Sequence, residues 1–455
     1  MRLTYFVRKA SKDAVLEGVK NIKRYQLLSQ KIISERNPLI TNGINSIFKH
    51  ADDRKLYRID QSKINSFLAA SSLSHMLDGW MYLSDSFNAL LNGDEGTAVH
   101  LCYYAELRSA MSILASEGIG VFDRKHIGVF SSNTNSEYPK NYYKGTPPNL
   151  SYKQPTSPTH TFVWEAMDKW ANSAFKPNSD ILKIFKVKGK NFYELTEYFH
   201  PSTAVSTLLG IQTIKSWLKD WCFDIKSYRN DRETRNEVSY RPQRIKDFNK
   251  IIDFQAIING LDSFWTVMSP LATDRYSLLD TYLLRKLYAG LYDNIDNPGQ
   301  RSDLIRNAFN QYGINDETLF NFLDFQHPYN DDHIIFQQAN IKQTTPLSII
   351  ARATLLLRIS VGLVSQLYNA GGINKTDLDF VWENYGIDCG FWNSGSTPLD
   401  FNNLWSDIQP SFNDLRSDIN TPGVDNSMYS IFGRNAEAIS HLGQINRACL
   451  WGLDF

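Results

Sequence analysis

The chain has 455 residues, which is enough for two or three domains and a large buried core. Its 48 basic and 48 acidic residues give a net charge of zero. Bulk charge therefore does not indicate binding to nucleic acid or to a membrane, although a net charge of zero does not exclude a local basic groove. The N-terminus is too polar for a signal peptide, and no run of eighteen apolar residues occurs.

Cysteine usage agrees with an intracellular setting. The four cysteines stand far apart among apolar neighbours and form no C-x-x-C pair, which is typical of reduced thiols in a protein core. They are Cys102, Cys222, Cys389 and Cys449. We therefore expect a soluble, cytoplasmic protein with no membrane segment.

The first part of the chain predicts a cap followed by a helical hairpin. Residues 1–63 have the character of a peripheral cap segment rather than of a domain. From Ile64 the apolar spacing is that of a long amphipathic helix, which ends at Asn92-Gly93. A second helix occupies residues 95–122, so the two helices should form an antiparallel hairpin.

The second helix, 95–122, is apolar nearly all round, which is typical of a helix at the centre of a bundle. It carries the aromatic pair Tyr103-Tyr104 beside Glu106 and Arg108. An arginine in such a helix needs a partner, because burying an unpaired charge is costly. We expect Arg108 and Glu106 to have a structural, supporting role.

A long loop insertion follows at 121–158 and is rich in Ser, Asn, Pro and Tyr. Loops of this length in folded chains are more often functional than decorative, and a disordered segment is the alternative. Its aromatic and basic side chains would stack on and neutralise a single-stranded nucleic acid, or else belong to an ordinary solvated loop. These side chains are Tyr138, Lys140, Tyr142, Tyr143, Lys144, Tyr152 and Lys153.

Helical periodicity resumes after the loop and leads into the densest basic group of the chain. This group consists of Arg229, Arg232, Arg235 and Arg241. Two interpretations are open: a solvated helix face that pairs with the neighbouring acids, or a surface that contacts phosphate. Residues 246–345 then predict connecting helices and a further loop.

A later stretch, 348–373, repeats the 95–122 helix in outline. It is a long apolar helix with a central arginine, Arg358, and it also ends in glycines. Each of the two helices is followed downstream by an Arg-Asn segment, at 235–240 and at 434–441. We therefore predict an all-α protein whose two helical halves, 64–245 and 346–455, are related by an internal duplication.

The second Arg-Asn segment has the composition of an RNA-cleaving site. Arg434 and His441 are seven residues apart, so on a helix they project from one face. An imidazole transfers protons near neutral pH, and a guanidinium binds a phosphate as charge builds on it. Asn435 would orient the pair or bond to the phosphate, and this chemistry needs no metal.

The segment 434–441 resembles the R-x4-6-H motif of the HEPN superfamily. The hairpin with its tyrosine-rich second helix, AVHLCYYAELRSAMSILASEGIG, is similar to that of many bacterial HEPN proteins. The resemblance implies a helical bundle that places two such motifs across a cleft. It also implies a metal-independent endoribonuclease, or an RNA-binding effector, of a bacterial anti-phage or toxin system, with products that end in a 2′,3′-cyclic phosphate.

The resemblance assigns roles to residues of both halves. Arg434, Asn435 and His441 would be catalytic, and the first half would complete the cleft and bind RNA phosphate. The residues of the first half with this role are Arg229, Arg232, Arg235, Asn236 and Tyr240. Tyr240 stands where the motif has histidine, and a phenol with a pKa near ~10 is a poor proton shuttle at neutral pH. Arg358 is expected to be structural support, like Arg108 and Glu106.

The alternative is a catalytically inert helical scaffold that binds a partner protein in a defence complex. In either case we expect no cofactor and no metal. A regulatory or sensor protein would be a further partner, and the sequence leaves homo-oligomerisation undecided. The cluster His327, Asp331, Asp332 and His333 has metal-binding residue types but the composition of a turn. No G-x-x-x-x-G-K-[ST], G-x-G-x-x-G or G-x-S-x-G motif occurs, which removes the usual support for nucleotide-dependent or α/β-hydrolase chemistry.

Overall fold

A computed structural model describes residues 3–42, 60–122, 126–130, 152–153, 158–172, 180–199, 208, 210, 212, 215, 225–240, 253–271, 274–292, 298–325, 333–339, 341 and 344–453. Within these ranges helices dominate and the strands form only two small antiparallel sheets. The all-α class predicted from the sequence is confirmed. The proposed duplication of two halves stays a prediction.

The centre of the molecule is a hairpin of two long helices. They are α5 (Gln61–Leu91) and α6 (Glu95–Ser116), which pack against each other along their length. The turn between them is formed as the sequence predicts: Gly93 adopts a φ of +76°, and Asp94 accepts a hydrogen bond of 2.9 Å from the backbone N–H of Thr97. The prediction of an antiparallel hairpin is confirmed.

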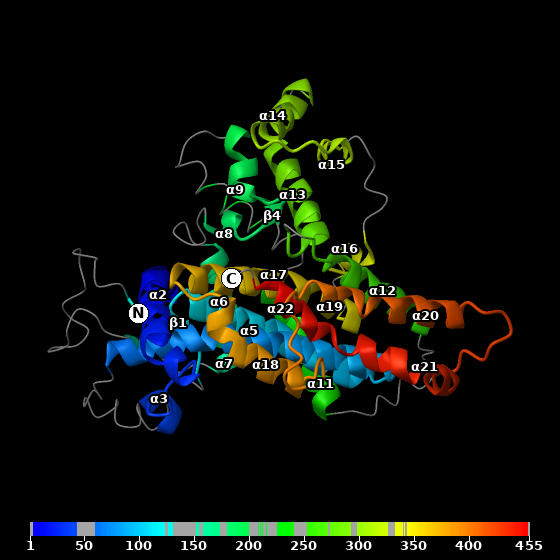
Figure 1. Ribbon diagram of the computed structural model, residues 1–455, viewed down its shortest axis with the longest axis horizontal. Helices are drawn as coiled ribbons and strands as arrows, with labels where there is room; N and C mark the ends of the chain where they lie inside the picture. The colour runs from blue at the N-terminus through cyan, green and yellow to red at the C-terminus, as the bar shows by residue number, and fades with distance from the viewer. Residues whose placement is uncertain are drawn as a thin grey trace.

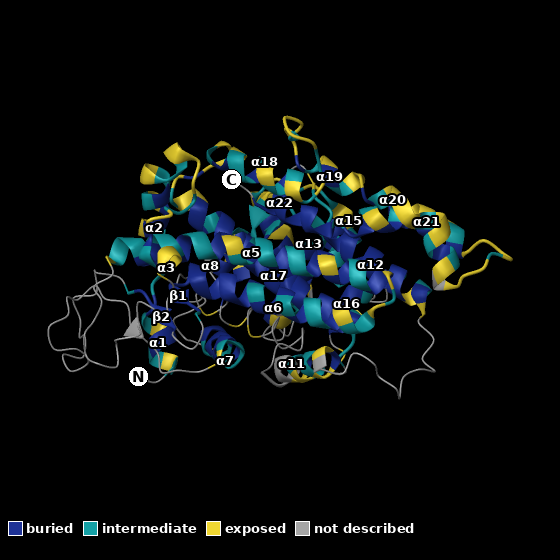
Figure 2. Ribbon diagram, turned by 90° about the horizontal axis from the view of Figure 1, so that it is seen from below, coloured by how far each residue is buried: buried dark blue, intermediate teal, exposed yellow. Residues whose placement is uncertain are grey.

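A third long helix, α17 (Pro346–Ala370), lies against both helices of the hairpin (Figure 1). Its first turn is fixed by a capping box between Thr345 and Ser348, and Pro346 occupies the N1 position. Figure 2 shows α17 and α6 as mostly buried helices in the middle of the bundle. By length and composition α17 could also span a membrane, but 94% of its most apolar window is buried inside the protein.

Further helices surround this core on two sides. The described part of the N-terminal segment packs into the bundle, because α2 lies along α5 and buries Val15, Val19 and Ile22. Helix α7 packs on α1 and α6, and α11 packs on α6 and α7. These flanking helices are α1 (Leu3–Lys9), α2 (Lys12–Tyr25), α3 (Pro38–Thr41), α7 (Thr159–Ala171) and α11 (Ile225–Tyr240).

A lobe rises from the long bundle in Figure 1. It consists of α8 (Asp180–Lys183), β4 (Lys186–Val187), β5 (Lys190–Asn191), α9 (Phe192–Leu195), α13 (Ser277–Tyr292), α14 (Pro298–Gln311) and α15 (Glu317–Leu323). Strands β4 and β5 of the lobe form one of the two small sheets. The other sheet has the order β1-β2-β3, and its strands are β1 (Ile119–Gly120), β2 (Ile127–Gly128) and β3 (Tyr152–Lys153). The predicted loop insertion thus contributes strands at both of its ends, while 131–150 lie outside the described residues.

The remaining helices cover the other side of the core and its far end. They are α12 (Phe254–Val267), α16 (Ile334–Ala339), α18 (Asp379–Asp388), α19 (Asn403–Ser406), α20 (Gln409–Ile419), α21 (Met428–Leu442) and α22 (Ala448–Gly452). In the described ranges, four 3₁₀ turns connect elements: η1 (Leu27–Ser29), η3 (Glu197–Phe199), η6 (Lys375–Leu378) and η7 (Ile445–Arg447). Cys102 and Cys449 are buried free thiols and Cys389 is a half-buried one, whereas Cys222 lies outside the described residues.

Candidate active site

The predicted catalytic arginine, Arg434, lies on α21 and is bound by an acid of α20. Its Nε and Nη2 donate to the two oxygens of Asp418 at 2.9 and 2.8 Å, and its Nη1 donates to the backbone carbonyl of Asp425 at 3.0 Å. Asn435 breaks the helix with φ −125° and ψ 24°, and its side chain also donates to Asp418. The bond from Arg434 lowers the pKa of Asp418. The guanidinium is therefore already paired with a carboxylate.

His441 also faces α20, and it lies two turns after Arg434 on α21. Its Nδ1 lies 3.3 Å from the hydroxyl of Ser411, so α20 and α21 are antiparallel with Arg434 opposite Asp418 and His441 opposite Ser411. Two turns of helix separate the two side chains by about 10 Å along the axis. Both do project toward α20, but each has its own partner there, and together they do not surround one phosphate.

The two Arg-Asn segments are not brought together. Both views place α21 at one end of the bundle, next to α20, and α11 on a flank of the bundle beside α7 (Figures 1 and 2). Arg235 contacts α6 and α7 there, and Arg434 contacts α20. The structure thus does not form the composite cleft in which the first half completes a site around Arg434 and His441.

A different group of side chains surrounds Arg235, at the junction of α6, α7 and α11. The Arg235 guanidinium lies 5.2 Å from the centre of the Tyr103 ring and 5.4 Å from that of Tyr104, within the range of cation–π attraction. Its Nη2 is 3.5 Å from Nε2 of His160. We refer to this group as the His160–Arg235 cluster, which consists of His100, Tyr103, Tyr104, His160, Thr161, Arg232, Arg235 and Ser239.

His160 is held from both sides of its ring. Arg235 only donates, so its contact assigns Nε2 as the acceptor and places the ring proton on Nδ1, which lies 2.9 Å from the Tyr103 hydroxyl. Burial, and then the positive charges of Arg235 and Arg232, lower the pKa of His160 to about 4. The imidazole is consequently neutral at physiological pH, with its Nε2 lone pair directed at Arg235.

The aromatic floor of the cluster is fixed by further contacts. Trp164 donates from Nε1 to the Tyr103 hydroxyl at 3.3 Å, and burial raises the pKa of Tyr103, which keeps it a phenol. Tyr104 is stacked on Tyr82 and lies 5.0 Å from the ring of His100. These are the tyrosines that the sequence of the second helix singles out.

The outer edge of the cluster is polar and accessible. His100 Nδ1 lies 2.7 Å from the hydroxyl of Ser239, and burial followed by the charge of Arg235 lowers the pKa of His100. Ser239 is exposed and His100 is half-buried. A ligand that enters from solvent would therefore meet this edge before it reaches His160.

The two arginines of the cluster have no acidic partner in the described part of the chain. Arg232 donates from Nη1 to the hydroxyl of Thr161 at 3.3 Å, and Arg235 contacts rings and His160 only. The Nε atoms of both are buried and form no hydrogen bond. Asp231, one of the acids on the same helix, is instead bound by Arg352. Asn236 is half-buried on α11, and the side chains of Arg229 and Tyr240 lie outside the described residues.

A buried charged group lies below the cluster. Arg352 of α17 binds both oxygens of Asp231, at 3.1 and 2.7 Å, and its Nε is 3.7 Å from Glu106 Oε1. Neither Glu106 oxygen has a hydrogen-bond partner, and burial raises the pKa of Glu106 well above its usual range. Burial thus favours the protonated form of Glu106, and the Arg352–Asp231 pair ties α11 to α17.

The other arginines named from the sequence are bound away from the cluster. Arg108 is only partly buried, and its Nη1 lies 3.5 Å from Asp78 and 3.2 Å from His75, both on α5. Its acid is therefore on the neighbouring helix and is not Glu106. Arg358 is buried and donates two hydrogen bonds to Asp280.

Metal binding finds no support in the described residues, which contain no group of three or more His, Cys, Asp or Glu side chains arranged to hold an ion. His333 packs instead against the rings of Tyr282 and Phe336. His327, Asp331 and Asp332 lie outside the described residues.

Sequence reasoning did not place His160 in a site. The residue is 57 positions from Tyr103 and 75 from Arg235, so no local spacing connects them. The available signal was its place on the first turn of α7, one residue before Thr161 and on a polar side of an otherwise apolar helix. Arg352 was missed as well, because Arg358 stands nearer the middle of the same helix.

Comparison of the chain with protein-family models, with curated proteins and with solved structures found no match.

Proposed function

We propose that the chain is a HEPN-like, metal-independent endoribonuclease whose centre is the His160–Arg235 cluster. The observation that carries the proposal is that Arg232 and Arg235 lack an acidic partner among the described residues while facing a neutral imidazole. A phosphodiester supplies the missing negative charge, and an arginine fork suits two of its oxygens. The sequence resemblance contributes the reaction class, in which an Arg–His pair cleaves RNA.

The chemistry then follows from the positions of the side chains. When Arg235 turns to the phosphate, it leaves His160 Nε2 open to the 2′-hydroxyl. His160 takes the proton of that hydroxyl, the oxygen attacks the adjacent phosphorus, and the 5′-oxygen of the next nucleotide leaves with a proton from solvent. Arg232 and Arg235 stabilise the charge on the phosphorane, and the products are a 2′,3′-cyclic phosphate and a 5′-hydroxyl.

A histidine with a low pKa is a weak base, and the negative charge of the bound substrate raises that pKa. The two arginines repel a proton from His160 in the free protein. A bound phosphate neutralises them, so the pKa of His160 rises toward the range in which an imidazole is an effective base. His160 takes the place that the motif gives to a histidine on the same helix as the arginine, where this chain has Tyr240.

The test is cleavage of total RNA by the purified full-length chain in the presence of EDTA. We expect products with cyclic ends, and we expect H160A and R235A each to lower the rate by about 10²–10⁴-fold, the usual contribution of an acid–base group or an anion-stabilising donor. H441A is the matched control, since it removes a histidine outside the cluster. Cleavage by H160A at the rate of the unmodified protein would refute the assignment.

The same experiment separates the proposal from its alternative. A chain that binds RNA through Arg232 and Arg235 without cutting it is an RNA-binding effector, which a gel-shift assay with R235A would show. A chain that neither binds nor cuts RNA is the inert scaffold, whose function is to hold a partner protein. For the active chain we propose a cytoplasmic role in bacterial anti-phage or toxin systems, with a regulatory or sensor protein to restrain it.

A further inference from the structure

One acid of α11 is spaced to neutralise Arg235 and does not do so. Asp231 precedes Arg235 by four residues, and side chains at this spacing on a helix are neighbours that form ion pairs. It is the only acid on α11 that stands three or four residues from Arg232 or Arg235. Glu233 and Glu237 each stand two residues from Arg235 and therefore face elsewhere. Local spacing alone would pair Asp231 with Arg235.

The structure directs Asp231 to the start of α17 instead. Its two oxygens accept hydrogen bonds from Nη2 and Nε of Arg352 at 2.7 and 3.1 Å, and Thr344 donates to one of them at 2.7 Å. The side chains of Asp231 and Arg352 are both only 1% exposed. Arg352 is itself fixed, because its Nη1 donates to the backbone carbonyl of Ile341 at 3.2 Å. Among the described residues, Asp231 thus bonds to Arg352 and Thr344 and not to Arg235.

A second acid near Arg352 does not compete for it. Glu106 Oε1 lies 3.7 Å from Arg352 Nε, but burial raises the pKa of Glu106 well above its usual range and favours the protonated form. The guanidinium of Arg352 is thereby left to Asp231. Two parallel N–H···O bonds are the geometry in which an arginine holds a carboxylate most firmly.

The consequence lies on the side of α11 that faces α6 and α7. Arg235 contacts the tyrosine rings of the His160–Arg235 cluster and Nε2 of His160, none of which carries a negative charge. An anion that reaches Arg235 therefore displaces no carboxylate among the described residues. Arg434 is the contrasting case, since Asp418 already binds its guanidinium.

We propose that Arg352 is a positioning residue, which holds Asp231 away from Arg235 and so keeps Arg235 available to a phosphate. The inference rests on the proposed phosphate-binding role of Arg235 and deepens it, because it assigns control of the charge in the cluster to the core helix α17. Arg352 acts through Asp231. If the pair only joined α11 to α17, loss of either partner would have the same effect on the cluster.

The test compares the two ways of breaking the pair. R352Q releases Asp231, which then turns to Arg235, whereas D231N removes the acid and leaves Arg235 as it is. The probe is a single-stranded 2′-O-methyl RNA oligonucleotide, which has no free 2′-hydroxyl and stays uncut, with binding to the full-length chain measured by fluorescence anisotropy. Its affinity should fall about tenfold or more in R352Q, as expected when a charged donor is lost to the ligand. It should stay close to that of the unmodified chain in D231N and in the double variant R352Q/D231N.

A second readout needs no RNA. The positive charge of Arg235 helps to lower the pKa of His160, so pairing of Arg235 with Asp231 in R352Q should raise that pKa. D231N should not raise it, and R352Q/D231N should return it to the value of the unmodified chain. NMR titration of labelled histidine side chains measures these values. A chain that binds no RNA would contradict the proposed function, and the titration would still decide this inference.

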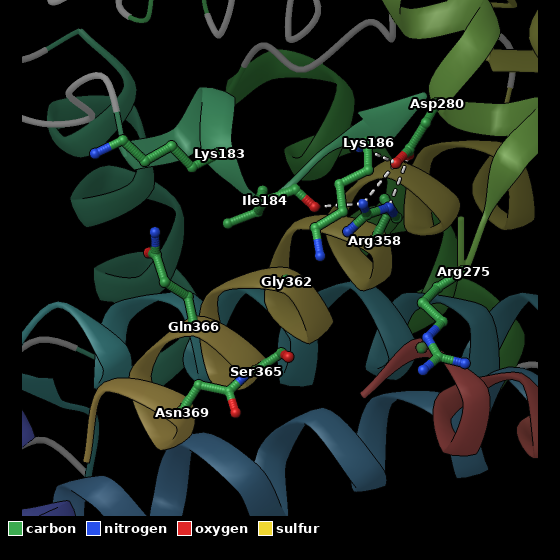
Figure 3. Close-up of a pocket in the computed structure, with 11 residues that line it drawn as sticks. Lys183, Ile184, Lys186, Arg275, Asp280, Arg358, Gly362, Ser365, Gln366 and Asn369 are labelled. Carbon is green, nitrogen blue, oxygen red and sulfur yellow. Dashed lines mark hydrogen bonds and ion pairs between the residues drawn. The ribbon is translucent and has the colours of Figure 1, made fainter. Parts of the chain in front are cut away.

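R358Q is the matched control, because it breaks the other buried ion pair of α17 outside the cluster. Figure 3 shows Arg358 directed at Asp280 and at the backbone carbonyl of Ile184, to which its Nη2 donates at 2.7 and 2.6 Å. R358Q should leave the RNA affinity and the pKa of His160 unchanged, which separates the effect of Asp231 from a general loss of stability.

R352K replaces R352Q if that variant does not fold. An ammonium keeps the positive charge but lacks the planar fork, so Asp231 is held less firmly and both readouts should change in the same direction by a smaller amount. Equal effects of R352Q and D231N would overturn the proposal. So would a pKa of His160 that R352Q leaves unchanged, because Asp231 would then have taken up a proton in place of pairing with Arg235.

Discussion

At the scale of single residues, Glu106 has the least expected environment. It is fully buried on α6, its oxygens lack hydrogen-bond partners, and burial raises its pKa far above the usual 4.5. The folded protein therefore keeps a proton that the unfolded chain releases above that pH. By linkage, folding stability falls as the pH rises above about 4.5, by up to ~1.4 kcal/mol for each pH unit below the raised pKa.

The substitution E106Q tests this linkage, because glutamine has the same shape and does not ionise. The variant should unfold at a higher temperature than the unmodified chain at pH 8, and the difference should shrink toward pH 5. Thermal unfolding followed by circular dichroism between these values measures it. Parallel pH profiles for the two proteins would show that Glu106 is ionised in the folded state.

His160 gives a second prediction at this scale. Its pKa is lowered to about 4 by burial first and by Arg235 and Arg232 next. R235Q removes one of the two charges, so the pKa of His160 should rise toward 6.5, and a bound RNA oligonucleotide should raise it in the unmodified chain. NMR titration of labelled histidine side chains measures both shifts.

R434Q serves as the control for that titration, since Arg434 contacts Asp418 and Asp425 rather than His160. It should leave the pKa of His160 where it is in the unmodified chain. An equal shift in R434Q and R235Q would mean that the local charge of Arg235 is not the cause.

At the scale of elements, α17 is held by two buried ion pairs. Arg352 binds Asp231 of α11, and Arg358 binds Asp280 of α13. Removing one partner of a buried pair leaves a desolvated charge, at a cost of about 3–5 kcal/mol. We expect D280N to lower the free energy of unfolding by about this amount in chemical denaturation.

The comparison for D280N is D418N, which removes the acid of the Arg434 pair between α20 and α21. That pair lies at the surface, where water replaces the lost contact. The midpoint of unfolding of D418N should therefore differ much less from that of the unmodified chain. If the two variants unfold at the same denaturant concentration, the buried pair contributes no more than the exposed one.

The sequence predicted helices well where local signals decide them. The hairpin of α5 and α6 was predicted because Asn92, Gly93 and Asp94 mark its turn and because apolar spacing marks its helices. The all-round apolar pattern also predicted the central place of α6. The strand pairs at 119–128 were missed because two-residue strands have no periodicity.

The site was less accessible to sequence reasoning. The R-x6-H spacing singled out Arg434 and His441, but the spacing does not reveal that α20 supplies Asp418 and Ser411 to them. Arg235 was named, whereas the imidazole beside it comes from a helix 75 residues away. A contact between distant segments depends on the fold of the whole chain, and no local pattern encodes it.

At the scale of the whole molecule, both predicted halves share one core. Helix α17 of the predicted second half packs on α5 and α6 of the first, and on α2, α12, α16 and α22. A fragment of residues 346–455 would expose most of the apolar surface of α17, so we expect it to remain unfolded when expressed alone. Poorly dispersed amide signals in its NMR spectrum would show this.

The full-length chain should by the same reasoning unfold in one cooperative transition in calorimetry, because breaking either half removes a face of the other. Two separate transitions, or a fragment 346–455 with dispersed signals, would show that the halves are independent domains.

The ion pairs of α17 also bear on how the protein is made. Arg352 and Arg358 pair with acids that lie 121 and 78 residues earlier in the chain. A ribosome adding about 5–20 residues per second therefore needs roughly ten seconds after it has made Asp280 before Arg358 can neutralise it. Until then α6 and α11 lack the helix that joins them, and the His160–Arg235 cluster at their junction is unsupported. A nascent or prematurely ended chain that lacks α17 would consequently not hold the His160–Arg235 cluster in the arrangement of the complete protein.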